Sequence, residues 1–290
     1  MIMTDYTKLI ARAEALLEKI ERIVPTVPAE PNWKTAVAFR WRKKNGVGYL
    51  QTVTHPHKIS LSDIHGVDDQ KKRIEQNTKQ FVAGRTANNI LLTGARGTGK
   101  SSLIKAVLNK FAKHGLRLIE VDKAELVDLP DIVDIISERR ERFVIFCDDL
   151  SFEASDPGYK ALKVVLDGSI SASSENMLIY ATSNRRHLMP EYMSENLEYK
   201  HIGDEVHPSE TVEEKISLSE RFGLWLSFYP FDQDDYLRIA EHWVKALDAE
   251  IPNAEVMRSE ALLWALTRSS RSGRVAYQFA RDWAGRSKKG

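Results

Sequence analysis

The stretch that decides the fold is Gly94-Ala95-Arg96-Gly97-Thr98-Gly99-Lys100-Ser101, which fits the pattern G-x-x-x-x-G-K-S/T at every position. It follows the apolar run 89–93 (NILLT) and precedes residues 101–114, whose apolar side chains recur at helical spacing. In a strand–loop–helix unit of this kind, glycines let backbone N–H groups curl around phosphate oxygens at the positive end of the helix. The stretch therefore predicts a phosphate-binding loop.

Two side chains of this loop carry the chemistry of nucleotide binding. Lys100 supplies a positive charge for the β- and γ-phosphates, and the Ser101 hydroxyl is a ligand for Mg²⁺. Ser102 follows directly, and we include it with the eight loop residues in the predicted nucleotide-binding set. The motif predicts that the chain binds ATP together with magnesium.

Short apolar runs alternate with helical segments from about residue 60 onwards. This alternation is typical of a parallel sheet covered by helices. After Pro230 the strand signals stop and only helical periodicity follows. The predicted strands are 89–93, 116–121, 143–147, 177–182 and 224–229, and the predicted closing helices are 232–248, 259–268 and 273–286.

The first 60 residues show a different sequence pattern. Residues 4–24 show helical spacing, and residues 35–53 read as two strands around Asn45-Gly46, a strong hairpin signal. Residues 39–44 (FRWRKK) interleave aromatic and basic side chains, which suits either nucleic-acid binding or a hairpin with a solvated basic face. The formal net charge of +1 favours the solvated face.

The composition indicates an ordinary globular protein, with 42% hydrophobic residues and one cysteine, Cys147, so an internal disulfide framework is excluded. The sequence shows neither a signal-peptide pattern at its start nor an apolar run long enough to cross a bilayer. We therefore expect a cytoplasmic protein without membrane contact.

A second chemical feature is the apolar run 142–147, which ends in Asp148 and Asp149. Such a run is typical of a buried strand in a parallel sheet, and ligands bind beyond the carboxyl ends of these strands. Asp148 is therefore a candidate magnesium ligand, and Asp149 is a candidate for orienting the attacking water. The alternative is an acidic turn that caps the next helix.

With these motifs in place, the chain resembles the AAA+ ATPases, and in particular a bacterial family of small stand-alone AAA+ proteins, over roughly residues 35–285. Four more stretches carry the resemblance. They are 61–68 (LSDIHGVD), 180–186 (YATSNRR), 218–223 (LSERFG) and 272–276 (SGRVA).

The resemblance implies roles in nucleotide contact for two of these stretches. Ile64 and Gly66 lie in the segment that forms part of the adenine pocket in the family. Asn184 matches the polar sensor at the tip of the fourth core strand, with Ser183 as the second choice. A side-chain amide there hydrogen-bonds the γ-phosphate and the attacking water.

The other two stretches imply arginines that act on the γ-phosphate. Arg221 matches the arginine finger, which reaches the site of a neighbouring subunit, and Arg185 and Arg186 compete for that role. Arg274 matches the second sensor, at the start of the last lid helix. A trans finger implies a homo-oligomer.

The chain departs from the family at the end of the acidic strand, where Asp148-Asp149 stands in place of the more common Asp-Glu. The second acid is shorter, and Glu153 is a possible substitute. The identity of the catalytic acid and the rate of hydrolysis therefore stay open.

We therefore expect a three-layer P-loop NTPase core of the AAA+ type, with a five-stranded parallel sheet in the order 5-1-4-3-2 implied by the family. The expected units are an N-terminal extension (1–60), the α/β nucleotide-binding core (61–231) and a C-terminal helical lid (232–290). The predicted function is magnesium-dependent ATP hydrolysis that drives conformational change in an oligomer or partner. The alternative is an ATP-switched binding or loader module with negligible hydrolysis, including one that associates with DNA.

Overall fold

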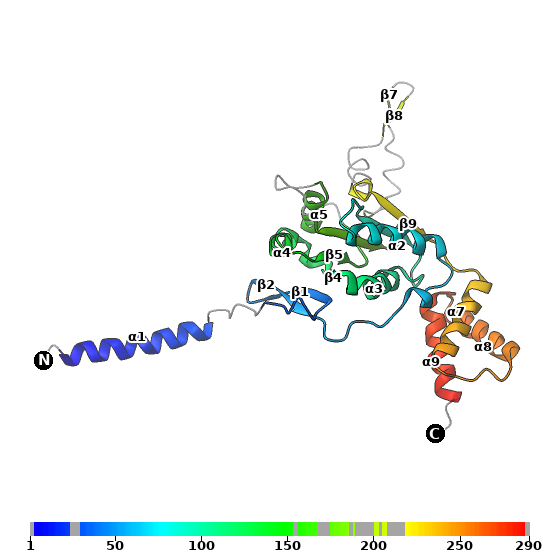
Figure 1. Cartoon of the computed structure of the whole chain (residues 1–290), viewed down its shortest axis with the longest axis horizontal. Coiled ribbons are helices and arrows are strands. Elements are labelled where there is room, and N and C mark those ends of the chain that lie inside the picture. The colour runs from blue at the N-terminus through cyan, green and yellow to red at the C-terminus, as the bar shows by residue number, and fades with distance from the viewer. Residues whose placement is uncertain are drawn as a thin grey trace.

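The computed structural model describes residues 3–23, 30–152, 156–167, 175–185, 188, 200–202, 205–207 and 218–287. It shows an α/β core, in which helices flank a mostly parallel sheet, followed by a small group of C-terminal helices (Figure 1). The predicted fold class is therefore confirmed.

The five predicted strands are all present and all parallel. In spatial order they are β9 (Leu224–Phe228), β3 (Ile90–Gly94), β6 (Met177–Ser183), β5 (Arg142–Cys147) and β4 (Leu116–Glu120). Numbered along the chain, this is the order 5-1-4-3-2 that the resemblance implied. The phosphate loop therefore leaves the sheet at β3, next to the edge strand β9, between the ends of β6 and β9.

The sheet is wider than predicted. A hairpin of β1 (Ala38–Lys44) and β2 (Val47–Thr52) continues it beyond β4, and β1 runs parallel to β4. The described residues thus form a seven-stranded sheet, which corrects the expected five. The hairpin lies in the core sheet, and the boundary expected at residue 60 separates two parts of one packed unit.

Burial of aromatic side chains explains why the hairpin joins the sheet. Phe39 and Trp41 are almost completely buried, in the same apolar cluster as Phe143 of β5. The Trp41 indole Nε1 donates a hydrogen bond of 2.9 Å to the Asp128 carboxylate, so its polar atom is satisfied inside the protein.

Three basic side chains of the hairpin are paired with acidic residues of the neighbouring chain segments. The ion pairs are Arg40–Glu120 (2.7 Å), Arg42–Asp122 (3.0 Å) and Lys43–Asp128 (2.7 Å). These charges are neutralised within the protein, as expected for a hairpin packed on the core. The hairpin is therefore a weak candidate for contacting nucleic-acid phosphates.

Helices cover both faces of the sheet, and alternate strand residues point to each face. One apolar cluster includes residues of α2 and α3, and the other includes residues of α4 and α5. The helices before the lid are α1 (Met3–Ile23), α2 (Asp68–Val82), α3 (Lys100–Phe111), α4 (Leu129–Ile136) and α5 (Pro157–Asp167), with 3-10 turns η1 (Leu61–Asp63), η2 (Ala112–His114) and η3 (Lys123–Asp128).

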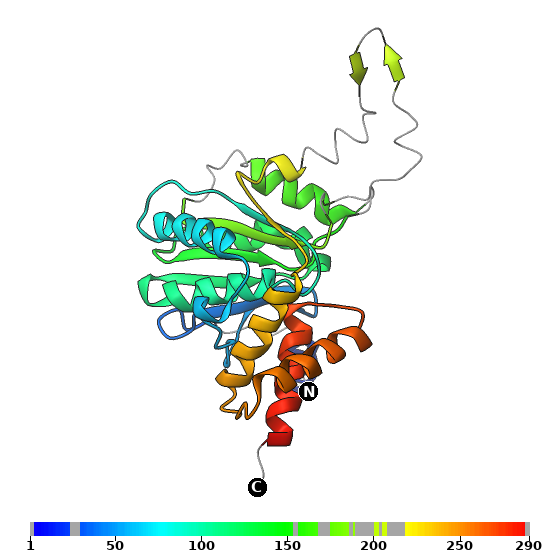
Figure 2. The ribbon, with the colours of Figure 1, turned by 90° about the vertical axis from the view of Figure 1, so that its right-hand side faces the viewer.

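The C-terminal helices α7 (Gln233–Ala246), α8 (Ala254–Thr267) and α9 (Gly273–Ser287) pack together at one end of the core (Figure 2). The Asp232 side chain accepts a hydrogen bond from the Asp235 amide and caps α7, and Asn253 caps α8 in the same way. A small antiparallel pair, β7 (Lys200–Ile202) and β8 (Glu205–His207), completes the described elements. Among the helices that the structure describes, each is too short or too polar to span a membrane.

Candidate functional site

The loop after β3 depends on glycine at its first position. Gly94 has φ +123°, and a Cβ there would lie 1.9 Å from the Phe228 carbonyl oxygen of β9. The Ala95 amide donates to the same oxygen at 3.1 Å. Gly97 and Gly99 also have positive φ, at +73° and +94°, so the loop turns sharply before α3 begins at Lys100. The first N–H groups of a helix have no partner within the helix, so those at the start of α3 are available to bind a phosphate.

Lys100 links the loop to the end of β6. Its Nζ donates to the carbonyl oxygens of Gly94 and Ala95, both at 2.7 Å, and to the Asn184 side-chain oxygen at 3.0 Å. Burial lowers the pKa of Lys100, while the nearby carboxylates of Asp149 and Asp148 act in the opposite direction. The predicted γ-phosphate cation and the predicted polar sensor therefore lie in direct contact.

The two predicted magnesium ligands also lie together. The Ser101 hydroxyl donates a 2.6 Å hydrogen bond to the Asp148 carboxylate, which is exposed at the end of β5. A hydroxyl and a carboxylate oxygen are the hard donors that Mg²⁺ prefers, so the residues fit the ion. Within the described part of the chain, no group of three or more His, Cys, Asp or Glu residues could hold a metal alone. A magnesium ion here would need water and phosphate oxygens as its other ligands.

Thr182 is a site residue that the sequence analysis missed. Its hydroxyl donates to the same Asp148 oxygen at 2.6 Å and accepts a hydrogen bond of 2.8 Å from the Asp149 amide. Cys147 pairs with Ala181 across β5 and β6, which brings Asp148 beside Thr182. The sequence feature that indicates Thr182 is a hydroxyl residue near the end of β6, the strand beside the one that leads to Asp148.

Asp149 is held by two groups of β6. Its amide bonds Thr182, and its carboxylate accepts a hydrogen bond from the Asn184 side-chain amide. Its φ of +52° is in the left-handed region. Lys100, Asn184 and Asp149 thus form one hydrogen-bonded chain across the mouth of the loop.

Of the four alternative candidates, two are described by the structure and two are not. Ser183 is fully buried and donates to the Leu150 carbonyl at 2.7 Å, so its hydroxyl is used in the structural core. Arg185 is exposed just beyond Asn184. Glu153 and Arg186 fall outside the described residues.

The C-terminal helices touch the loop from the other side. The Gly273 amide donates to the Gly97 carbonyl at 2.8 Å. A Cβ at Gly97 would lie 2.8 Å from Ser272 Cβ and 3.7 Å from Arg274 Cβ. The start of α9 therefore rests on the phosphate loop, with the exposed Arg274 beside it.

The segment that carries Ile64 and Gly66 lies between the loop and α7. Ile64 is buried, and a Cβ at Gly99 would approach its Cγ2 to 4.0 Å. Gly66 has φ +72° and leaves no room for a Cβ, which would lie 2.9 Å from the Phe231 ring. Between them, the His65 ring stacks edge-on against His242 of α7, with centroids 4.3 Å apart.

Arg221 contacts a different part of the core. Its Nε forms an ion pair with Asp167, the last residue of α5. Its neighbours Leu218 and Phe222 are buried in the apolar cluster of α4 and α5. Cys147 is also buried, and burial raises its pKa to about 12, so the thiol is unreactive at neutral pH.

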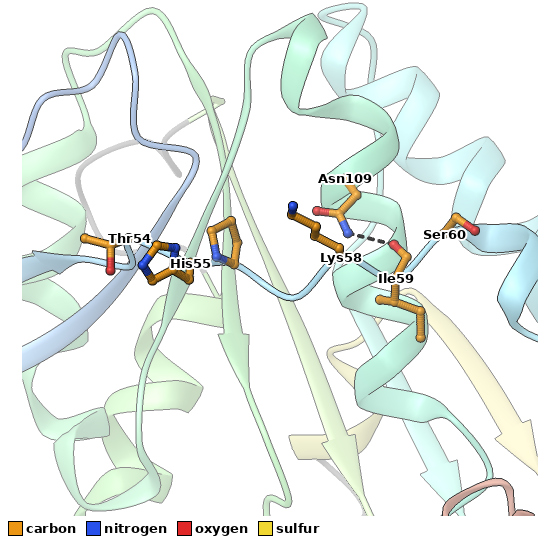
Figure 3. Close-up of a pocket in the computed structure, with 7 residues that line it drawn as sticks. Thr54, His55, Lys58, Ile59, Ser60 and Asn109 are labelled. Carbon is orange, nitrogen blue, oxygen red and sulfur yellow. Dashed lines mark hydrogen bonds between the residues drawn. The ribbon is translucent and has the colours of Figure 1, made fainter. Parts of the chain in front are cut away.

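A separate cavity of about 430 Å³ lies under the segment that joins β2 to η1 (Figure 3). Asn109 of α3 donates to the carbonyls of His57 and Ile59, at 2.7 and 2.6 Å, and so fastens this segment to the core. The cavity contains none of the predicted site residues. Its lining residues are Thr54, His55, Pro56, Lys58, Ile59, Ser60 and Asn109.

The strand order, the glycine loop at the end of β3 and the helical group resting on it match the AAA+ fold. The chain belongs to the family described as "Protein of unknown function (DUF815)", which matches residues 34–287. The search of curated proteins found no match.

Solved structures share this fold at low sequence identity. The FIGL-1 AAA domain in complex with ADP aligns with a TM-score of 0.53 and 18% identity, over 79% of this chain and 73% of that one. ORC1 from Aeropyrum pernix in complex with DNA gives 0.52 and 18%, over 78% and 62%. A point mutant of RuvB from Thermotoga maritima gives 0.51 and 17%, over 77% and 64%. The chain therefore spans less than two thirds of the ORC1 and RuvB chains, and the likeness is one of fold.

Proposed function

We propose that this protein binds ATP with magnesium in the loop of residues 94–101 and hydrolyses it to ADP and phosphate. The observation that carries the proposal is the hydrogen-bonded chain from Lys100 through Asn184 to Asp149, beside the Ser101–Asp148 pair. A cation, an amide, a carboxylate and a pair of magnesium donors thus converge at the mouth of one glycine loop. The ADP in the FIGL-1 complex supports an adenine nucleotide as the ligand.

Each side chain then has a defined task. Lys100 exchanges its loop carbonyl partners for phosphate oxygens, and backbone N–H groups at the start of α3 bind the same phosphates. Ser101 and Asp148 hold magnesium, which neutralises phosphate charge when it is bound. Asp149 orients the attacking water and accepts its proton, and the Asn184 amide fixes that carboxylate in place.

The lid and a neighbouring subunit supply the remaining charges. Arg274 reaches the γ-phosphate from the start of α9 and couples the lid to the nucleotide state. Arg221 acts on the site of the next copy in a homo-oligomer, after leaving its ion pair with Asp167. Arginine fingers of this kind are worth about 10³ to 10⁵ in rate.

A second candidate function is an ATP-switched binding module with negligible hydrolysis. The observation that favours it is that the short Asp149 carboxylate already bonds the Asn184 amide, which competes with water for that oxygen. A loader that contacts DNA is the version suggested by the ORC1 complex. The paired charges of the β1–β2 hairpin argue against that hairpin as its DNA contact.

Phosphate release and ATP binding, measured on the same samples, test these proposals. Lys100→Ala should abolish ATP binding, while Lys105→Ala on the same helix α3 should leave it unchanged. Asp149→Asn should keep ATP affinity and lose turnover, with Asp69→Asn on the exposed start of α2 as the matched control. A wild-type protein that binds ATP without releasing phosphate at any concentration would establish the switch instead.

The trans role of Arg221 needs its own measurement. Specific activity should rise with protein concentration through the range in which particle mass shows assembly. Activity that stays flat across that range would exclude a finger supplied by a neighbour.

A further inference from the structure

Helix α1 carries an apolar stripe that is exposed to solvent. Figure 1 shows α1 standing apart from the core. Five large apolar side chains of this helix are between 54% and 68% exposed: Tyr6, Leu9, Ile10, Leu16 and Leu17. With Ala13 they recur at spacings of three and four residues, which places them on one face. A helix of this kind gains stability only when another apolar surface covers the stripe.

Between residues 9 and 19 of α1, where the structure describes the side chains, the charged residues divide by sign on the two sides of this stripe. At 3.6 residues per turn, Arg12 and Lys19 lie on one flank, and Glu14 and Glu18 lie on the other, each roughly 100° or more from the centre of the stripe. The four side chains are all exposed. The stripe therefore has a basic border and an acidic border.

We propose that α1 is an assembly helix, whose stripe packs against α1 of other copies of this chain in a parallel bundle. In a parallel arrangement, the basic border of each helix faces the acidic border of the next, so every contact is attractive. In an antiparallel pair, borders of the same sign meet, which is repulsive. The charge pattern thus selects both the occupant and its orientation.

The width of the stripe points to more than two helices. Three apolar positions in every seven make a broader face than the two-position seam of a two-stranded coiled coil. A helix in a larger parallel bundle uses such a face to contact a neighbour on each side. This arrangement has cyclic symmetry, and it presents all cores from the same end of the bundle.

A membrane surface is a poorer match for the same helix. Helices that lie on anionic membranes carry an excess of Lys and Arg on the polar face, whereas α1 carries acids and bases in equal number among its described exposed residues 9–19. The inference does not depend on ATP hydrolysis, because it concerns α1 alone.

The first test is the mass of the full-length protein against concentration, without nucleotide. Leu16→Asp should weaken self-association at least about ten-fold, since one buried leucine contributes that much or more to an association constant. Ala15→Asp adds the same charge one residue away, on the polar face, and should leave association unchanged. Retained ATP binding by both variants shows that the core is folded.

The second test reverses the charges on the two borders of the stripe. Arg12→Glu/Lys19→Glu makes both borders acidic, and Glu14→Lys/Glu18→Lys makes both basic, so each double variant should associate less than wild type. An equimolar mixture of the two should restore association. Tyr6→Cys should form a disulfide between copies under mild oxidation, because a parallel bundle brings equivalent residues together, and the native Cys147 is buried.

Several results would overturn the proposal. A wild-type chain that stays monomeric up to about 100 μM would overturn it, because even weak specific assemblies form at that concentration. Equal masses for wild type and Leu16→Asp, no rescue in the mixture, or no Tyr6→Cys cross-link would exclude the parallel bundle. Sedimentation of a monomer with phosphatidylcholine–phosphatidylserine vesicles would assign the stripe to a membrane instead.

Discussion

Replacing Gly97 by alanine tests whether the lid rests on the phosphate loop as the structure shows. Gly97 has φ +73°, and an alanine in this left-handed region costs about 1–2 kcal/mol. The new Cβ would also lie 2.8 Å from Ser272 Cβ and 2.9 Å from Ser272 Oγ, well inside normal contact. Overpacking of this size adds about 1–3 kcal/mol. We expect Gly97→Ala to lower the free energy of unfolding by about 2–5 kcal/mol in total.

A double-mutant cycle separates the two contributions. Ser272→Gly removes the atoms that the new Cβ meets, so Gly97→Ala in that background should recover the overpacking share and keep the backbone share. Gly115→Ala is the matched control, because Gly115 has φ +91° with nothing within 4 Å of its Cβ position. The assay is urea unfolding, followed by tryptophan fluorescence, with ATP affinity measured in parallel. If Gly97→Ala costs no more than Gly115→Ala, or if Ser272→Gly recovers nothing, the lid does not contact the loop in this way.

Three further substitutions test the site and the fold. Thr182→Val leaves the Asp149 amide without its acceptor and should cost about 1–3 kcal/mol in urea unfolding, with weaker magnesium-dependent ATP binding; unchanged values would contradict the described contact. Trp41→Phe removes a buried donor from Asp128 and should lower the free energy of unfolding by a similar amount, about 1–3 kcal/mol. A free energy of unfolding equal to that of wild type would show that the hairpin is held by burial alone. Burial lowers the pKa of His65 below its ordinary value of 6.5, so the unfolded chain takes up a proton more readily than the folded one, and stability should fall as pH drops below about 6.5. His65→Gln should reduce this dependence in unfolding measured from pH 7.5 to pH 5, and equal slopes for variant and wild type would refute the assignment.

The strands of the central sheet could be predicted because each strand has its own local sequence pattern. A short apolar run bounded by polar residues indicates a buried strand wherever its neighbours lie, and the strand–loop–helix context of residues 94–101 places β3 among them. The spatial order came from the family resemblance and not from the apolar pattern. Nothing in an apolar run states which strand lies beside it.

The attachment of the hairpin could not be predicted in this way. Asn45-Gly46 indicates local antiparallel pairing of β1 with β2, and that pairing is present. The pairing of β1 with β4 depends on contacts far apart in the chain, such as Trp41 with Asp128. The alternation of aromatic and basic residues in β1 reflects one face that is buried and one whose basic side chains form ion pairs.

The candidate site shows the same division. Lys100, Ser101, Asp148 and Asn184 meet because the carboxyl ends of adjacent parallel strands lie at one edge of the sheet. Thr182 was missed because a threonine inside an apolar strand reads as an ordinary β-branched residue until the neighbouring strand is known.

The geometry of Asp149 gives the unusual Asp-Asp pair a structural reason. Its backbone is left-handed, with φ +52°, and aspartate tolerates this region better than longer side chains because it hydrogen-bonds locally. The Asp149 amide and carboxylate are bonded to Thr182 and Asn184, so the turn and the position of the acid are set together. A glutamate would place its carboxylate one methylene further from its own backbone and would fit this left-handed conformation less well. The shorter acid therefore suits this turn, and it is compatible with either a working catalytic base or a switch. Because Asp149→Asn keeps the local hydrogen-bonding capacity and the tolerance for a left-handed backbone, a loss of turnover in that variant would report on the charge and not on the turn.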